Sequence, residues 1–470
     1  MTKHNADPIW AMTETHRADF VRLADQVFDT PEVAYTERRS VEAHIAQLQA
    51  EGARITRDLA GIPTAVMGEW GEGGPVIAIL GEYDALPALG QEPGVADERP
   101  TGGAGHGCGH NLLGSAAMLA AVAVRDWLRE TGRPGRIRYF GCPAEEGGAA
   151  KTFMVREGLF ADVDAAVSWH PADYTGVFEA RSLANTRIDF TFHGRAAHAA
   201  ASPELGRSAL DAVELMNVGV NYMREHMPDD ARVHYAYLDA GGEAPNVVQA
   251  RATVRQLIRA RDNKGLRGLV ERVRKIAEGA ALMTETRVEA RVVSAVSNLM
   301  PSPVLERLMD GHIARLGAPD FDEADRAFAR AIRATLTPEH IADTFARTGR
   351  PLDPDLALCD FVVPLGSAPA AAQGSTDVGD VSWAVPTVQA WVATCAIGTP
   401  FHSWQLTAQG KSPAAHKGMV HAAKIMAATA RDLFERPEVL AAARAEHAAT
   451  LARDPYVCPM PPEVLPPVPR

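Results

Sequence analysis

Three short apolar segments, each followed by polar residues, constrain the fold of this chain more than any other feature. They span residues 75–80, 136–142 and 164–169, and a strongly apolar helical segment at 112–130 separates the first two. Apolar runs of this length are typical of strands buried on both faces, and strands that alternate with helices form mostly parallel sheets. The sequence therefore predicts an α/β fold with a mixed, mostly parallel sheet sandwiched by helices.

The pattern changes from about residue 182. Six further elements are expected in the order strand, helix, strand, strand, helix and strand, at residues 186–193, 207–225, 232–238, 247–259, 264–282 and 287–293. This order is that of a ferredoxin-like unit. We predict an inserted α+β domain at residues 184–298, with a catalytic domain formed by residues 1–183 and 299–470.

The C-terminal third returns to the first domain. Residues 317–377 are expected to be irregular apart from a helix at 323–334. Strand-like runs at 378–395 and a helix at 415–434 would complete the domain, and the Pro-rich tail from residue 454 is expected to be extended.

Composition excludes several classes of protein. The 470 residues include 47 Lys and Arg against 59 Asp and Glu, a net charge of −12, which argues against a nucleic-acid partner. The longest apolar run, at 116–124, falls short of the ~20 residues that span a bilayer, so no membrane association is expected. Five scattered cysteines make a poor disulfide framework, and the N-terminus has no apolar signal region; we therefore expect a cytoplasmic protein.

Polar residues follow each of the three predicted strands. Asp84 follows the first, Glu145 and Glu146 follow the second, and His170 follows the third. Ligands of parallel α/β sheets bind beyond the carboxyl ends of the strands, so these residues are expected to meet. Two adjacent carboxylates repel unless a cation is shared, and one could bind metal while the other faces an attacking water.

A Gly-rich stretch at residues 101–110 contains Cys108 and His110. It departs from the spacing of dinucleotide and phosphate loops, whereas a thiolate and an imidazole are good ligands for Zn²⁺. Taken alone, the pair is better explained by a buried cysteine and a loop histidine. With His402, which precedes the last helix, and the residues at the strand ends, the set suits two divalent ions and a base.

These motifs resemble the co-catalytic metallopeptidase/aminoacylase family, specifically its amidohydrolase branch, which includes the plant auxin-conjugate hydrolases. The resemblance rests on residues 107–110, Glu145 with Glu146, Trp169 with His170, and His402, and extends over about residues 15–435. Segments 374–383 and 404–419 resemble the subgroup that acts on aminobenzoyl-glutamate.

The resemblance implies two divalent ions per subunit, zinc or manganese. Cys108 would bridge them, and the remaining ligands would be His110, Glu146, His170 and His402. Glu145 would be the general base and later the acid, and Asp84 would orient a ligand. Relatives outside the branch have a ligating histidine where this chain has Glu82, so the role of Glu82 stays open.

For the inserted domain, the resemblance implies a homodimer, with room for a second related subunit. His198 would reach the partner's active site and stabilise the oxyanion, and Asn246 would contact the scissile region. Arg259 would hold a substrate carboxylate, with Arg195 and Lys411 as the next candidates.

The expected reaction is hydrolysis of the amide bond of an N-aroyl or N-acyl amino acid. The favoured substrate is p-aminobenzoyl-glutamate, which would give p-aminobenzoate and glutamate. One alternative is a broader N-acyl-amino-acid hydrolase or dipeptidase. Another is a non-catalytic binding subunit, against which the intact ligand set and Glu145 argue.

Overall fold

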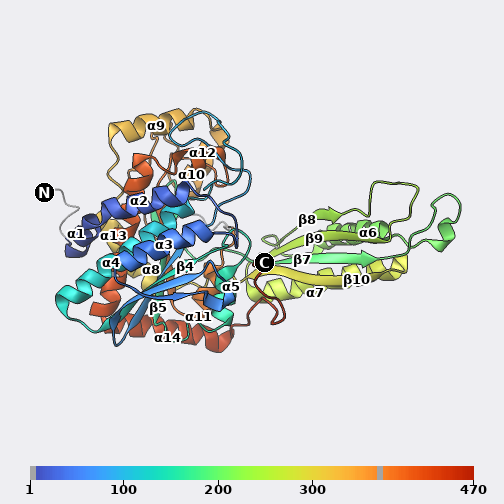
Figure 1. Cartoon of the computed structure of the whole chain (residues 1–470), viewed down its shortest axis with the longest axis horizontal. Coiled ribbons are helices and arrows are strands. Elements are labelled where there is room, and N and C mark those ends of the chain that lie inside the picture. The colour runs from blue at the N-terminus through green and yellow to red at the C-terminus, as the bar shows by residue number, and fades with distance from the viewer. Residues whose placement is uncertain (1–6, 368–373, 470) are drawn as a thin grey trace.

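Two β-sheets organise the chain, one in each of two lobes (Figure 1). The computed structural model describes residues 7–367 and 374–469. The larger lobe contains an eight-stranded sheet in the order β1-β2-β4-β3-β5-β12-β6-β11. The smaller lobe, which projects to one side, contains a four-stranded sheet in the order β10-β7-β9-β8.

The strands of the large sheet are β1 (Arg54–Arg57), β2 (Val66–Glu72), β3 (Val76–Glu82), β4 (Gly135–Cys142), β5 (Ala165–Ala172), β6 (Thr175–Val177), β11 (Val362–Val363) and β12 (Thr387–Ala393). Strands β4, β3, β5 and β12 run parallel at its centre, whereas β2 and β6 pair antiparallel with β4 and β12. The predicted mixed, mostly parallel sheet is therefore confirmed, and β3, β4 and β5 are the three strands from which it was inferred.

Helices cover both faces of this sheet. Those of the large lobe are α1 (Pro8–Thr15), α2 (Arg17–Phe28), α3 (Arg38–Ala50), α4 (His110–Thr131), α5 (Ala150–Arg156), α8 (Pro303–Leu316), α9 (Glu323–Arg333), α10 (Pro338–Arg347), α11 (Val378–Ala384), α12 (Trp404–Gln409), α13 (Pro413–Glu435) and α14 (Pro437–Arg453). The central helix α4 is buried along nearly its whole length, because β3 and α13 pack on it and α1 and α2 cover the rest.

The small lobe consists of β7 (Ala184–His193), α6 (Ala209–Met223), β8 (Arg232–Asp239), β9 (Arg251–Ala260), α7 (Asn263–Thr284) and β10 (Arg287–Val296). The predicted β-α-β-β-α-β order is present. Both helices pack on one face of the sheet, where Ile188, Phe190 and Val254 are buried. The opposite face carries charged residues, as the alternation along β7 and β9 requires.

Two predictions for the C-terminal third are wrong. Residues 317–367 contain more regular structure than the one predicted helix, since α10 follows α9 and β11 joins the large sheet. Residues 368–373 lie outside the described part of the chain. The strand-like run from residue 378 begins as helix α11, because Val378 and Val381 form a helical apolar face that packs on α5. The described part of the tail from residue 454 contains neither helix nor strand and makes a turn at residues 462–463, and Met460 is buried.

The bounds of the other elements differ from the predicted bounds by only a few residues. The strand expected at 247–259 begins at Arg251, because Val247 instead bridges to His198 in the preceding loop. Helix α4 begins at His110, two residues earlier than expected. Among the described residues, no helix has both the length and the apolar character needed to cross a bilayer.

Candidate active site

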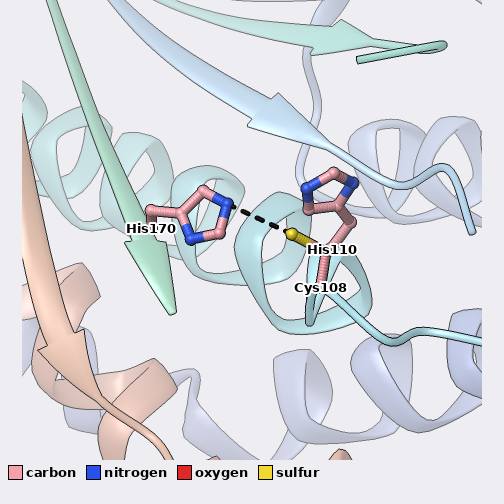
Figure 2. Close-up of side chains that lie close together, drawn as sticks. All are labelled: Cys108, His110 and His170. Atoms are coloured by element: carbon pink, nitrogen blue, oxygen red, sulfur yellow. Dashed lines mark hydrogen bonds between the residues drawn. The ribbon is translucent and has the colours of Figure 1, made fainter. Parts of the chain in front are cut away.

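The carboxyl ends of β3, β4 and β5 bring the predicted site residues together, as expected for adjacent parallel strands. Asp84 lies just beyond β3, and Glu145 and Glu146 lie just beyond β4. His170 lies near the end of β5 rather than after the strand. The start of α4 supplies Cys108 and His110, so that both side chains and the ring of His170 converge (Figure 2).

Cys108 and His170 face each other, with Sγ 3.5 Å from Nε2. The other ring nitrogen of His170, Nδ1, lies 2.8 Å from the Pro171 carbonyl oxygen. A carbonyl oxygen can only accept, so Nδ1 carries the proton and the lone pair of Nε2 points toward Cys108. Burial, helped by the charge of His110, lowers the pKa of His170 to about 4. The ring is therefore neutral at pH 7.

His110 is held by two carboxylates and is completely buried. Its Nδ1 lies 2.9 Å from Asp84 Oδ1, and its Nε2 lies 3.3 Å from Glu82 Oε2. The second oxygen of Asp84 accepts a hydrogen bond from the Glu146 backbone N–H at 2.9 Å. Asp84 therefore fixes the orientation of the His110 ring and ties it to the Glu145–Glu146 loop, the arrangement that commonly orients metal-binding histidines.

Glu146 and His402 form the other half of the cluster, with Oε2 3.3 Å from Nε2. The His402 backbone N–H donates to the Gly107 carbonyl oxygen at 2.8 Å, which docks this loop against the Cys108 segment. Burial opposes ionisation of Glu146, but its hydrogen bond to His402 and the charge of His110 outweigh it and lower the pKa to about 2. Glu146 is a carboxylate at neutral pH.

The donor set fits two divalent ions. Two groups of ligand atoms share Cys108: one adds His110 and His170, the other adds Glu146 and His402, and within each group all atoms lie within 4.8 Å. Among the described residues, His110 Nε2 and Glu146 Oε1 are buried without a hydrogen-bond partner, which costs free energy unless something satisfies them. Thiolate, imidazole and carboxylate are together the ligands that Zn²⁺ and similar ions prefer. Cations in this cluster would satisfy those atoms.

Glu145 stands beside the ligands but differs from Glu146 in its ionisation. Burial, together with the charges of Glu82, Glu146 and Asp377, raises its pKa well above the ordinary range of a glutamate. The loop that carries it is tight: a side chain at Gly148 would lie 2.5 Å from the ring of Tyr35 and 2.6 Å from Ala144 Cβ. A carboxyl group of raised pKa suits general acid–base catalysis.

Sequence reasoning missed a buried ion cluster behind the site. Lys151 Nζ lies 2.6 Å from Glu82 Oε1 and 2.6 Å from Asp377 Oδ1, and none of the three side chains is more than 3% exposed. The only signal for Lys151 is a lysine within an otherwise apolar stretch. Its charge allows Glu82 to stay ionised beside His110, although burial opposes this, so the pKa of Glu82 is lowered.

Arg259 lies where the small lobe meets the large one. It is half-buried near the end of β9, and its Nη1 lies 3.2 Å from Ser375 Oγ. Of the two alternatives to Arg259, Lys411 is paired with Asp29 at 2.9 Å, and Arg195 follows β7 at the far end of the small sheet.

His198 and Asn246 lie together, apart from Arg259. The Ala199 backbone N–H donates to the Asn246 carbonyl oxygen at 3.0 Å, and His198 is exposed. The loops that carry them form the tip of the small lobe farthest from the large lobe (Figure 1). Strand β9 alone has ten residues, or about 30 Å of extended chain. The structure therefore does not bring His198 and Asn246 to the Cys108 cluster of their own chain.

Comparison with known proteins agrees with this geometry. The model of peptidase family M20/M25/M40 matches residues 78–436. The chain is 47% identical to one of the subunits of p-aminobenzoyl-glutamate hydrolase from Escherichia coli over 467 residues, covering 96% of this chain and 97% of that protein. It is 27% identical to the mouse Xaa-Arg dipeptidase, over 92% of this chain and 89% of that one.

A solved structure shows the same fold. The dinuclear metal-binding peptidase of Bacillus subtilis superposes with a TM-score of 0.58 at 19% identity, covering 89% of this chain and 99% of that one. The family match includes the parallel strands at the centre of the large sheet from residue 78 onward, the cluster around Cys108 and the whole small lobe. This chain is therefore a hydrolase that belongs to peptidase family M20/M25/M40.

Proposed function

We propose that this enzyme hydrolyses the amide bond of N-aroyl or N-acyl amino acids, with p-aminobenzoyl-glutamate as its substrate. One observation carries the proposal: Glu145 stands beside two groups of possible metal ligands that share the buried Cys108. The substrate named for the Escherichia coli relative supports the choice, given 47% identity across nearly the whole of both chains.

In the proposed mechanism, Cys108, His110, Glu146, His170 and His402 hold two divalent ions, zinc or manganese. When bound, such ions polarise the substrate carbonyl and lower the pKa of the attacking water. Glu145 takes the proton of that water and later delivers it to the leaving amine. Asp84 keeps the His110 ring in the tautomer whose Nε2 faces the cluster.

We further propose that residues 184–298 form an inserted lid and dimerisation domain, and residues 1–183 and 299–470 the catalytic domain. Strand β8 lies at the edge of the small sheet, and α6 exposes Leu215, Val218 and Tyr222 along one side. With the exposed side chains of Tyr235 and Tyr237 on β8, these residues make an apolar surface suited to a second copy of the chain.

A homodimer would also complete the active site. His198 and Asn246 would enter the partner's site, where His198 would donate a hydrogen bond to the carbonyl oxygen as it becomes negative. Arg259 would hold the substrate carboxylate in its own chain's site. The Escherichia coli relative is named as one of two kinds of subunit, which leaves room for a second, related chain in this enzyme too.

We also propose a cytoplasmic location. All five cysteines are free thiols, which supports it.

The test is release of p-aminobenzoate from p-aminobenzoyl-glutamate by protein supplied with Zn²⁺ or Mn²⁺. The parent enzyme should turn over, and Glu145→Gln should lose at least ~10²-fold in kcat while keeping its metal. Glu157→Gln, which alters an exposed carboxylate at the opposite end of α5 from this loop, is the control and should keep full activity. Near-parental turnover by Glu145→Gln would place the base elsewhere.

A further inference from the structure

A second arginine, Arg187, lies next to Arg259 where the two lobes meet. In the register of β7 and β9, Asn185 is opposite Arg259 and Leu257 is opposite Arg187. Arg187 and Arg259 are therefore diagonal neighbours on the face of the small sheet that α6 and α7 leave uncovered. Diagonal neighbours are about 7–8 Å apart at Cα, so two long side chains can reach one ligand.

Farther out on this face, the charged residue next to Arg187 along β7 is paired. Asp189 accepts from Arg255 at 2.6 and 3.0 Å and from Arg291 at 3.1 Å. Within the described residues, the side chain of Arg187 makes neither an ion pair nor a hydrogen bond. The side chain of Arg259 makes one hydrogen bond in this part of the chain, to the hydroxyl of Ser375. At the lobe junction, by contrast, neither Arg187 nor Arg259 has an ion pair within the described residues, and Arg232, opposite Arg259 on β8, donates to the backbone carbonyl oxygens of Asp229 and Ala231.

Both of these guanidinium groups are half-buried. Burial lowers the pKa of Arg187, and the nearby charges of Arg255 and Arg259 lower it further, against a smaller opposing effect of Asp189; burial also lowers the pKa of Arg259. Two like charges held together out of water destabilise each other unless an anion is bound between or beside them. The arrangement is therefore one that a bound anion would stabilise.

The position of Arg187 connects it to the active site. A Cβ added to Gly147 would lie 3.0 Å from Arg187 Nη1 and 3.4 Å from Nη2. The guanidinium therefore rests against the loop that carries Glu145 and Glu146. Arg259 meets the large lobe at Ser375, two residues from Asp377 of the buried ion cluster. Arg187 thus borders the site from the small-lobe side, with Arg259 as its diagonal neighbour on the sheet.

We propose that Arg187 binds the side-chain carboxylate of a dicarboxylic substrate while Arg259 binds its α-carboxylate. The site would then select N-acyl derivatives of glutamate or aspartate over those of neutral and basic amino acids. This inference rests on the proposed amide hydrolysis. A guanidinium can hold each carboxylate through two parallel hydrogen bonds, which an amide in the same place cannot match. A basic side chain, by contrast, would be repelled.

The experiment compares p-aminobenzoyl-glutamate with p-aminobenzoyl-glutamine, which differ only in the side-chain carboxylate. The parent enzyme should prefer the glutamate compound by at least about 30-fold in kcat/KM, the loss expected when a buried charge is left unpaired. Arg187→Gln should bring this ratio close to one, and Arg187→Lys, which keeps the charge without the fork, should give an intermediate ratio. Arg259→Gln should lower kcat/KM on both compounds and keep the preference.

Arg255→Gln is the matched control, since that guanidinium lies on the same face but is paired with Asp189. It should keep the parental ratio. A parent enzyme that hydrolyses both compounds equally, or an Arg187→Gln variant that keeps the parental ratio, overturns the role of Arg187 and leaves amide hydrolysis standing. A metal-loaded parent that hydrolyses neither compound overturns the proposed function itself. If Arg187→Gln does not fold, the role of Arg187 is tested by the preference of the parent enzyme and by the kcat/KM ratio of Arg187→Lys.

Discussion

Replacing Lys151 with methionine tests whether the buried ion cluster stabilises the large lobe. Methionine has a similar length but no charge, so Glu82 and Asp377 would lose the ammonium group that lies 2.6 Å from each. Breaking a buried pair by removing one partner costs about 3–5 kcal/mol, because the remaining charge is left uncompensated. Two carboxylates lose their partner here, so we expect the upper half of that range.

The assay is urea unfolding of the metal-free protein followed by tryptophan emission. All seven tryptophans lie outside residues 184–298, so the signal reports on the large lobe and not on the small one. Adding Glu82→Gln to Lys151→Met should recover part of the loss, since one of the two unpaired charges is then removed.

The control is Lys411→Met. Lys411 Nζ lies 2.9 Å from both carboxylate oxygens of Asp29, but Asp29 is 59% exposed and remains hydrated after the change. The control should therefore lose far less stability than Lys151→Met. Equal losses in the two variants, or a loss below about 1 kcal/mol in Lys151→Met, would refute a stabilising role for the buried cluster.

Four further changes test the site. Glu146→Gln should lower the bound metal measured by elemental analysis, because a ligand is lost; an unchanged content would remove it from the ligand set. Asp84→Asn should weaken metal binding ~10–100-fold in chelator competition, since the charge is lost and one amide oxygen cannot replace the two carboxylate oxygens that accept from His110 and Glu146; unchanged affinity would contradict that role. Mixing inactive His198→Ala and Glu145→Gln chains should restore part of the activity in hybrid dimers, whereas confirmed exchange without activity would exclude action between subunits. Arg259→Ala should lose the preference for p-aminobenzoyl-glutamate over its α-amide, which we expect to be ~30- to 5,000-fold in the parent, and an unchanged preference would assign the carboxylate to another group.

The central sheet and the cluster at its edge could be predicted because their signals are local. An apolar run bounded by polar residues predicts a buried strand without knowledge of its neighbours, and adjacent parallel strands necessarily place their carboxyl ends together. Asp84, Glu145 and His170 were therefore expected to meet, and the structure places them at the ends of β3, β4 and β5. The spacing of Cys108 and His110 across the start of α4 completes the arrangement.

The ion cluster behind the site could not be predicted in this way. Lys151 and Asp377 are 226 positions apart in the sequence, and neither has a periodicity or spacing that points to the other. Their pairing depends on the packing of α11 against α5. The same packing explains why the strand-like run predicted from residue 378 is wrong at its start. The apolar residues of α11 pack on α5 as a helix, and strand β12 begins only after that helix ends.

Arg187 shows a second reason why part of the site could not be predicted from the sequence. Its place on the open face of β7 follows from strand alternation, but its significance depends on which neighbours pair with it. Asp189 forms ion pairs with Arg255 and Arg291, whereas no carboxylate of the described residues forms one with Arg187, and only the structure distinguishes these cases. The separation of Asn246 from Arg259, by contrast, follows from the length of the strand between them and needs no knowledge of its neighbours.

The most direct test of a two-metal site built around Cys108 is the metal content of Cys108→Ala. The parent, purified without chelator and reconstituted with Zn²⁺ or Mn²⁺, should hold close to two ions per chain by elemental analysis. Because Cys108 belongs to both ligand groups, Cys108→Ala should fall well below the parent content. Cys142→Ala, which removes another buried thiol outside those groups, should retain the parent content. A Cys108→Ala protein that still holds two ions, or a parent that holds none after reconstitution, would contradict the account.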